Sequence, residues 1–123
     1  MRKEEIDNIK SQMRKGMLEF CVLSMLSHEK AYPSDILKAL AASDLVVVEG
    51  TIYALLNRLK REGKLSYEWQ ESRQGPPRKY FFVTDYGREV LSAMEDSWNE
   101  IKLAVNYFQQ HENPMNKENE TNI

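Results

Sequence analysis

The spacing of apolar residues in this 123-residue chain changes at Gly63, from the period of an amphipathic helix to that of a strand. The apolar residues before Gly63 recur at helical spacing and are Ile52, Leu55, Leu56 and Leu59. After it, Leu65, Tyr67 and Trp69 alternate with polar residues, which is typical of a half-buried strand. Glycine readily adopts the left-handed conformation that ends many helices. We therefore predict a helix over residues 50–62 that runs directly into a strand.

A second strand is expected over residues 79–83, because this segment is aromatic and β-branched. The two strands would form a hairpin. Gly75, Pro76 and Pro77 lie between them and are poorly accepted inside a strand or a helix, so we assign them to the connection. The order predicted for this part of the chain is therefore helix, strand, turn and strand, with a basic hairpin tip over residues 72–78.

The segment before residue 49 is expected to hold one long helix and one short helix. The long helix would run from Lys3 to about Ser27, amphipathic at first and apolar later. Pro33 suits the first position of the short helix, where its missing N–H costs nothing. Residues 45–48 are largely β-branched, which favours an extended connection held against the core. The predicted order is thus helix, short helix, turn and helix.

Thr84 is expected to cap a long last helix, with Asp85 in its first turn. Apolar residues repeat along this helix at the a and d spacing of a coiled coil. They are Leu91, Met94, Trp98, Ile101, Val105 and Phe108. Together with Ile6 and Ile9 of the first helix, this stripe predicts a homodimer. The alternative is that the stripe packs on the chain's own first helix, and the two arrangements are compatible.

Length and composition indicate a single-domain cytoplasmic protein. The longest apolar run, residues 17–26, is interrupted by polar residues and is shorter than the roughly 20 residues that span a bilayer. The N-terminus is charged and unlike a secretory signal, so we expect no membrane association. Cys21 is the only cysteine, which excludes an intrachain disulfide. Its apolar surroundings predict a buried side chain, with a redox sensor as the alternative.

Charge is unevenly distributed along the chain, although the net charge is only -2. Residues 57–80 contain seven basic and three acidic side chains, a local charge of +4, whereas most of the excess acid follows Asp85. Such segregation is expected of a protein with one face that meets phosphates. A set of solvated helix faces is the alternative.

Catalysis and metal binding are both disfavoured. His28 and His111 are the only histidines, and no plausible group of nucleophile, base and orienting residue can be assembled around either of them. One cysteine and two scattered histidines cannot supply a closed site of four nitrogen and sulfur ligands. We therefore expect neither an enzyme nor a bound metal or other cofactor.

Four segments of the chain resemble, in order, the PadR family of bacterial transcriptional regulators. They are residues 14–26, 49–59, 75–80 and 83–87, with Tyr32 opening the second helix. The resemblance covers about residues 5–110. The single C-terminal helix is similar to the short subfamily that contains a multidrug-responsive regulator of Lactococcus. Many members have glycine where this chain has Pro33, a change expected to affect only the helix entry.

The resemblance implies a mainly α fold with a small β-hairpin (α+β), a winged helix-turn-helix with a long C-terminal dimerisation helix. We expect a DNA-binding domain over residues 1–83, the dimerisation helix over 84–111 and a disordered tail over 112–123. The resemblance also implies a homodimer that represses transcription by binding double-stranded DNA. Two DNA-binding heads would require a pseudo-palindromic operator.

The helix over residues 50–62 would enter the major groove of DNA. The residues expected at base edges are Thr51, Tyr53, Asn57 and Arg58, and those expected at phosphates are Lys60, Arg61 and Lys64. The hairpin residues expected at the minor groove or backbone are Arg73, Gln74, Gly75, Arg78 and Lys79. There are two alternatives: Tyr53 packs against the second helix, or Arg78 and Lys79 only solubilise the hairpin edge.

The resemblance also implies an effector site at Trp98, because the matching tryptophan of multidrug-responsive relatives sandwiches flat aromatic compounds against its two-fold mate. The residues expected to complete this apolar site are Met13, Met94 and Ile101. Asp96 and Glu100 would favour cationic ligands. In the alternative, Trp98 only fills the dimer core. For the chain as a whole, the alternative function is a winged-helix protein-interaction module without sequence-specific DNA binding.

Overall fold

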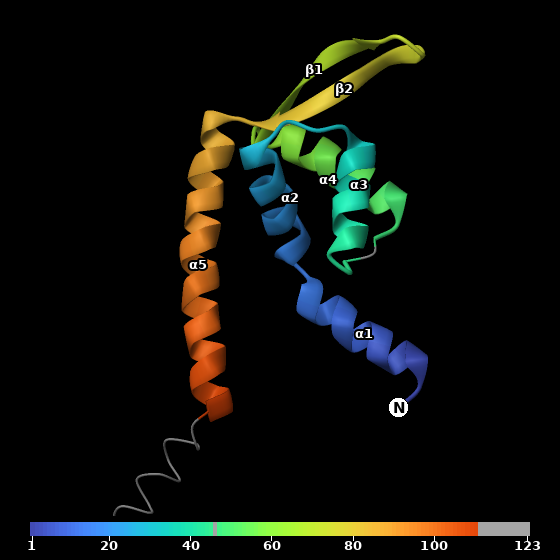
Figure 1. Ribbon diagram of the computed structural model, residues 1–123. Coiled ribbons are helices and arrows are strands. Elements are labelled where there is room, and N and C mark those ends of the chain that lie inside the picture. The colour runs from blue at the N-terminus through green and yellow to red at the C-terminus, as the bar shows by residue number, and fades with distance from the viewer. Residues whose placement is uncertain (46, 111–123) are drawn as a thin grey trace, which may run out of the picture. The chain divides into compact units, whose positions relative to one another are not determined.

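The computed structural model describes residues 1–45 and 47–110. The disordered tail expected over residues 112–123 lies outside this range. The described residues form, in chain order, α1 (Lys3–Arg14), α2 (Met17–His28), α3 (Pro33–Ala42), α4 (Glu49–Arg61), β1 (Leu65–Ser72), β2 (Gly75–Val83) and α5 (Asp85–Gln110) (Figure 1). The predicted fold class is confirmed: a mainly α chain with one antiparallel hairpin and a long C-terminal helix.

The chain divides into two compact units, Met1–Leu91 and Ser92–Ile123. The first unit contains the hairpin, the first four helices and the first turns of α5. Its apolar core is formed by α2, α3, α4, both strands and the start of α5. The buried residues are Val22, Leu23, Leu26, Ala31, Ile36, Leu40, Ile52, Leu55, Leu56, Leu59, Leu65, Phe81, Val83 and Leu91. All four members of the predicted α4 stripe are among them, and each contributes about 1.5–3 kcal/mol of burial free energy.

The N-terminal segment forms two helices, so the prediction of one continuous helix to Ser27 is wrong. Helix α1 ends at Arg14 and α2 begins at Met17. Gly16 lies between them with a φ of 87°, in the left-handed region that glycine adopts without the steric cost of a Cβ. The two helices also differ in burial, because α1 contributes no buried residue whereas α2 contributes three.

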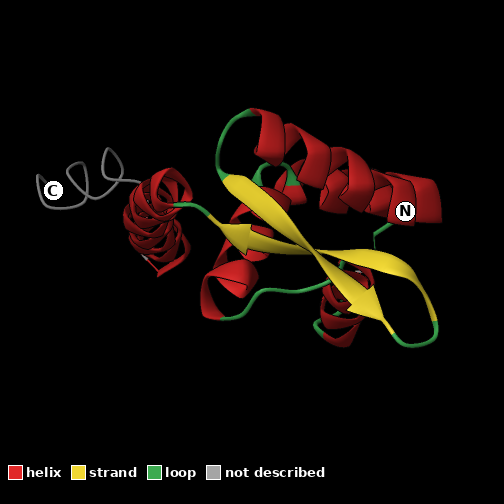
Figure 2. Ribbon diagram, turned by 90° about the horizontal axis from the view of Figure 1, so that it is seen from above, coloured by secondary structure: helices red, strands yellow, loops and turns green. Residues whose placement is uncertain are grey.

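The hairpin forms as predicted, but its turn is shorter than expected and the predicted alternation of covered and exposed residues stops at Trp69, which is exposed. The two strands pair antiparallel in a twisted ribbon (Figure 2). Leu65 lies opposite Val83, and Trp69 lies opposite Lys79. Gly75, Pro76 and Pro77 belong to β2 rather than to the connection, which corrects their assignment. The register shifts between Gln70 and Ser72, so the two prolines lie at an irregularity. Proline is accepted at such a place because no ladder hydrogen bond is required from its nitrogen.

A backbone bridge ties the hairpin to the segment between α2 and α3. The Ala31 N–H donates to the Phe81 carbonyl oxygen at 3.1 Å, and the Phe81 N–H donates to the Ala31 carbonyl oxygen at 2.9 Å. Both side chains are buried, at 5% and 3% exposed. The bridge therefore fixes β2 beside the start of α3.

The connection before α4 departs from its expected place against the core. Val48 is 75% exposed, while Leu45 and Val47 are half-buried, and Val46 lies outside the described residues. Val48 precedes the first turn of α4, and its carbonyl oxygen accepts the Thr51 N–H at 2.9 Å. The backbone of Val48 thus accepts a hydrogen bond from the first turn of α4, while its side chain is exposed to solvent.

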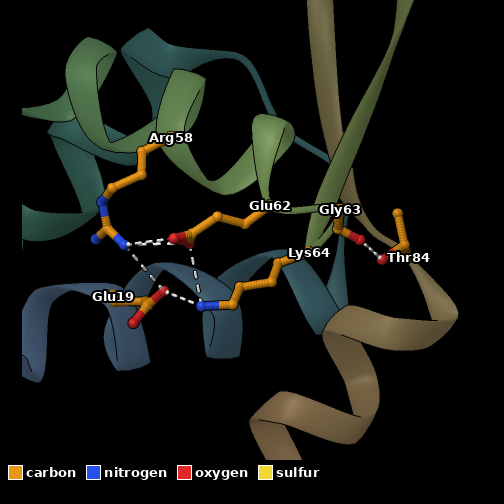
Figure 3. Close-up of polar contacts among 6 residues, drawn as sticks. All are labelled: Glu19, Arg58, Glu62, Gly63, Lys64 and Thr84. Carbon is orange, nitrogen blue, oxygen red and sulfur yellow. Dashed lines mark hydrogen bonds and ion pairs between the residues drawn. The ribbon is translucent and has the colours of Figure 1, made fainter.

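Thr84 caps α5 as predicted. Its Oγ1 accepts the Gly87 N–H at 3.0 Å and donates to the Gly63 carbonyl oxygen at 2.6 Å, a bond shown in Figure 3. Gly63 has a φ of 78°, which confirms the predicted left-handed helix end. Gly87 is buried because the backbone of Lys64 passes over it: an added Cβ would lie 2.1 Å from the Lys64 carbonyl oxygen. Only glycine fits this contact.

The apolar stripe of α5 is exposed in the single chain from its third member, Trp98, onward. Met94 is half-buried and the following members are exposed: Trp98 36%, Ile101 48%, Val105 48% and Phe108 70%. Leu91 is only 6% exposed, so it belongs to the core of the first unit, which argues against its predicted place in a seam between chains. In α1, Ile6, Ile9 and Met13 are exposed at 39%, 48% and 78%.

Two smaller observations complete the fold. Cys21 is half-buried rather than buried. Among the described residues, no helix combines the length and apolar character needed to cross a bilayer.

Candidate nucleic-acid interface

Helix α4 presents two polar flanks on either side of its buried stripe. With 100° between successive residues, Tyr53, Asn57 and Lys60 fall on one flank, and Arg58 and Glu62 fall on the other. The first flank borders the hairpin, whereas the second borders α2. The two groups of polar side chains predicted to contact DNA therefore have different surroundings.

The first flank opens into a groove of about 540 Å³ between the start of α3, helix α4 and the hairpin. The residues that line this groove are Tyr32, Pro33, Ser34, Tyr53, Leu56, Asn57, Trp69, Arg78, Lys79 and Phe81. Among these described lining residues, two are cationic and none is acidic. The structure thus brings together four of the predicted DNA-contact residues, Tyr53, Asn57, Arg78 and Lys79. We name this hollow the junction groove.

Aromatic rings hold the cations around the junction groove. The Lys79 ammonium lies 4.5 Å from the centroid of Tyr67 and 5.3 Å from that of Trp69. The Lys60 ammonium lies 5.0 Å from the centroid of the same Tyr67 ring, and the Arg78 guanidinium lies 5.3 Å from the centroid of the Tyr32 ring. Each such contact contributes about 0.5–1 kcal/mol at an exposed site. Because a ring carries no net charge, these cations keep their full positive charge.

An aromatic pair and an ion pair connect the hairpin to the segment that directly precedes α3. The rings of Tyr32 and Tyr80 lie with centroids 3.9 Å apart, and a hydrogen bond with Tyr32 raises the pKa of the Tyr80 hydroxyl. Lys30 forms an ion pair with Glu68 of β1. The hydrogen bond in this pair raises the pKa of Lys30 and lowers the pKa of Glu68.

Lys64 does not extend as a free phosphate-binding side chain, which corrects its predicted role. Its ammonium lies 3.0 Å from a carboxylate oxygen of Glu19 and 3.1 Å from one of Glu62 (Figure 3). Its side chain is only 16% exposed. Burial acts to lower the pKa of Lys64, but the hydrogen bonds to Glu19 and Glu62 outweigh it and raise the pKa above its ordinary value. Lys64 thus stabilises the joint between α2, α4 and β1.

Arg58 belongs to the same ion-pair network. Its Nη1 lies 3.2 Å and 3.4 Å from the two carboxylate oxygens of Glu62, and 3.7 Å from Glu19 (Figure 3). The hydrogen bond from Lys64 is the main cause of the lowered pKa of Glu62, and Arg58 adds to it. Arg58 is 44% exposed but is paired with acids on the flank away from the junction groove. The structure therefore does not place it with the other predicted base-contact residues.

The remaining predicted residues are exposed. Thr51 lines a separate hollow with residues of α1 and the start of α2. Tyr53 is 45% exposed and lines the junction groove beside the start of α3. The alternative that Tyr53 packs against this helix therefore holds only in part. The exposed residues of the α4 end and the hairpin tip are Lys60, Arg61, Arg73, Gln74 and Gly75.

Apart from the buried Leu56 and Phe81, sequence reasoning missed four lining residues of the junction groove: Tyr32, Pro33, Ser34 and Trp69. Tyr32 and Ser34 come from the entry to α3, and only the position of Tyr32 at a helix start pointed to them. Trp69 was assigned to the covered face of the strand, but it is 61% exposed. Its exposure follows from the outward extension of the hairpin beyond Tyr67, which no local pattern predicts.

Two helices, α3 and α4, followed by a hairpin bridged at Ala31, define a winged helix-turn-helix, a class of DNA-binding domain. Within this class, the chain belongs to the PadR-like family of transcriptional regulators, whose family model matches residues 22–93. Members of this family are DNA-binding regulators rather than enzymes.

Solved structures of the same family are similar to most of this chain. A PadR-like transcription factor from Bacteroides fragilis is 55% identical, with a TM-score of 0.70, and the match covers 81% of this chain and 97% of that one. A PadR family regulator from Eggerthella lenta is 31% identical, with a TM-score of 0.79 and coverage of 89% and 96%. A PadR-like regulator from Bacillus cereus is 37% identical, with a TM-score of 0.73 and coverage of 82% and 99%.

Proposed function

We propose that this protein is a cytoplasmic transcriptional repressor that binds a pseudo-palindromic operator as a homodimer. The observation that carries the proposal is the junction groove, in which Arg78 and Lys79 lie beside the exposed flank of α4 without a neighbouring acid among the lining residues. Helix α4 would enter the major groove through Tyr53 and Asn57. The hairpin tip, residues 72–75, would contact the adjacent minor groove or backbone.

The contact residues fall into two groups under this proposal. Those at base edges are Thr51, Tyr53 and Asn57, and those at phosphates or the minor groove are Lys60, Arg61, Arg73, Gln74, Gly75, Arg78 and Lys79. Arg58 and Lys64 have structural ion pairs instead. Residues 1–83 would form the DNA-binding domain, and residues 84–111 would supply the dimerisation helix.

Dimerisation is supported by two apolar faces whose residues are exposed, apart from the half-buried Met94. One face lies on α5 and consists of Met94, Trp98, Ile101, Val105 and Phe108, and the other lies on α1 and consists of Ile6, Ile9 and Met13. The α5 residues follow the a and d spacing of a coiled coil. In water, exposed apolar stripes of this kind favour association with a second copy.

A planar aromatic or drug-like effector would bind at Trp98, lined by Met13, Met94 and Ile101. The support is chemical: Trp98 is 36% exposed within an apolar stripe, and methionine adapts to ligands of varied shape. Asp96 and Glu100 are exposed on the same helix and would favour a cationic compound. Binding there would alter the spacing of the two DNA-binding heads.

The test is fluorescence anisotropy of a labelled duplex from the region upstream of this protein's own gene, with a scrambled duplex as control, across a salt series. A repressor should prefer the native duplex by about 10³ or more and lose affinity steeply with salt. Weak and equal binding to native and scrambled duplexes, without a salt dependence, would instead support a winged-helix protein-interaction module.

A further inference from the structure

We propose that the junction groove seats the sugar-phosphate backbone that separates the two DNA grooves, and that Trp69 is a backbone contact within it. This inference rests on the proposed DNA-binding function and extends it to a residue outside the predicted contact set. Its ligand is one strand of duplex DNA at the boundary between the major groove entered by α4 and the minor groove reached by the hairpin tip.

The position of the groove matches the path that such a strand would take. A protein that puts a helix in the major groove and a hairpin tip in the adjacent minor groove must pass over the backbone between them. In this chain, the junction groove lies between α4 and the hairpin, with Leu56 and Phe81 among its lining residues at 1% and 3% exposed. Ser34 and Asn57 supply polar groups from α3 and α4. The groove is therefore bounded by the same elements that would flank the strand.

The charge of the groove suits a polyanion. Lys79 is held by the rings of Tyr67 and Trp69, at 4.5 Å and 5.3 Å, rather than by a carboxylate. Arg78 lies over the ring of Tyr32 in the same way, at 5.3 Å. Rings position these cations without neutralising them, so a phosphate can approach and release its counterions. Lys64 makes the contrast clear, since it lies between two carboxylates.

Trp69 has the chemistry of a backbone contact. Trp69 is 61% exposed, although Tyr67 and Lys79 lie against its ring. An indole ring presents an apolar face to a deoxyribose and an N–H that donates to a phosphate oxygen. Contacts to sugar and phosphate position a protein on DNA but do not read sequence. Loss of Trp69 should therefore weaken binding to every duplex by a similar factor.

The first experiment compares the dissociation constants of wild type, Trp69→Ala and Trp69→Phe for native and scrambled duplexes. We expect Trp69→Ala to weaken binding to both duplexes by about tenfold and to leave their ratio unchanged. Trp69→Phe, which keeps a ring against Lys79, should recover most of the loss. Tyr86→Ala is the matched control, because Tyr86 is 52% exposed and lies outside the groove lining. Circular dichroism checks that each variant folds.

The second experiment neutralises single phosphates of the native duplex with methylphosphonate. Substitution at the phosphates between the major-groove and minor-groove contacts should weaken wild-type binding. The same substitution should have little further effect on Lys79→Ala, since the charge that it meets is already gone.

Unchanged affinity of Trp69→Ala in the presence of normal wild-type binding would overturn this inference and leave the proposed function intact. A loss confined to the native duplex would also overturn it, because Trp69 would then read a base. Absence of any salt-dependent DNA binding by the wild type would overturn the proposed function, and the backbone site with it.

Discussion

The ammonium of Lys64, immediately before β1, lies 3.0 Å from a carboxylate oxygen of Glu19 on α2. These two residues are 45 positions apart in the chain. Together with Arg58 and Glu62, they join α2, the end of α4 and the start of the hairpin through four charged groups that balance one another (Figure 3). Arg58 and Lys64 are therefore engaged in ion pairs within the first unit and are not unpaired cations.

This contact separates the roles of two lysines. Lys64→Ala should lower the free energy of unfolding by about 1–3 kcal/mol, because it removes the nearer of the two cations that pair with the largely buried carboxylate of Glu19. It should leave the slope of log affinity against log salt unchanged. Lys79→Ala should reduce that slope by about 0.9, the contribution of one phosphate, with little effect on stability. Urea unfolding and anisotropy measure the two quantities, and the reverse pattern would contradict these assignments.

Stability should fall in acid because of Glu62 and Glu68. Both have a native pKa below the ordinary value for a glutamate carboxyl group, held down by hydrogen bonds from Lys64 and Lys30 respectively. As pH falls, the unfolded chain takes up these protons first, so the stabilisation present above that pH is lost as pH drops through the native pKa. The melting temperature should decline from about pH 6 to about pH 3. A double Glu62→Gln, Glu68→Gln variant should show a flatter profile, and an unaltered profile would count against this cause.

Gly87→Ala should destabilise the protein by about 3 kcal/mol. The added Cβ would lie 2.1 Å from the Lys64 carbonyl oxygen and 2.7 Å from a Val83 methyl group, so the start of α5 would have to move. Gly50→Ala is the matched control, because nothing lies within 4 Å of its added Cβ. Removing glycine from a helix should raise stability there by about 0.5–1 kcal/mol. Thermal unfolding of both variants measures this difference. Equal stability of the two would show that the start of α5 can move to accept the added methyl group.

A charge in the α5 stripe should prevent dimerisation. Ile101→Glu should weaken self-association by about 30-fold or more, equal to about 2 kcal/mol, because a carboxylate would be buried between apolar surfaces. Leu103→Glu is the control: Leu103 is 72% exposed and lies outside the a and d positions. Sedimentation equilibrium measures both. A monomeric wild type, or equal loss in both variants, would place the interface elsewhere.

A planar aromatic dye should quench the fluorescence of Trp98. The chain has two tryptophans, so Trp69→Phe leaves Trp98 as the emitter and Trp98→Phe leaves Trp69. Quenching should persist in Trp69→Phe and disappear in Trp98→Phe if the ligand stacks on the α5 residue. Equal quenching in both variants would contradict an effector site at this position.

Local patterns predicted most of the secondary structure for identifiable reasons. The stripe from Ile52 to Leu59 and the glycine at its end were sufficient to define α4, because burial and backbone conformation both repeat at short range. The break at Gly16 was missed, since the apolar residues continue through it and one glycine in a helical pattern is often tolerated. The place of Pro76 and Pro77 within β2 does not follow from local patterns, because the bulge that accommodates them depends on the partner strand.

The sequence by itself determined the order of helices and strands, the core stripe of α4 and the basic character of residues 57–80. Only the tertiary structure decided which of those basic residues keep a charge available for DNA. Lys64 and Lys79 look equivalent along the chain, but the fold places Lys64 against Glu19 and Lys79 over aromatic rings. The physical reason is that the neutralisation of a cation depends on the charges within a few ångströms of it in space. For these two lysines, those neighbours come from α2 and from the paired strand.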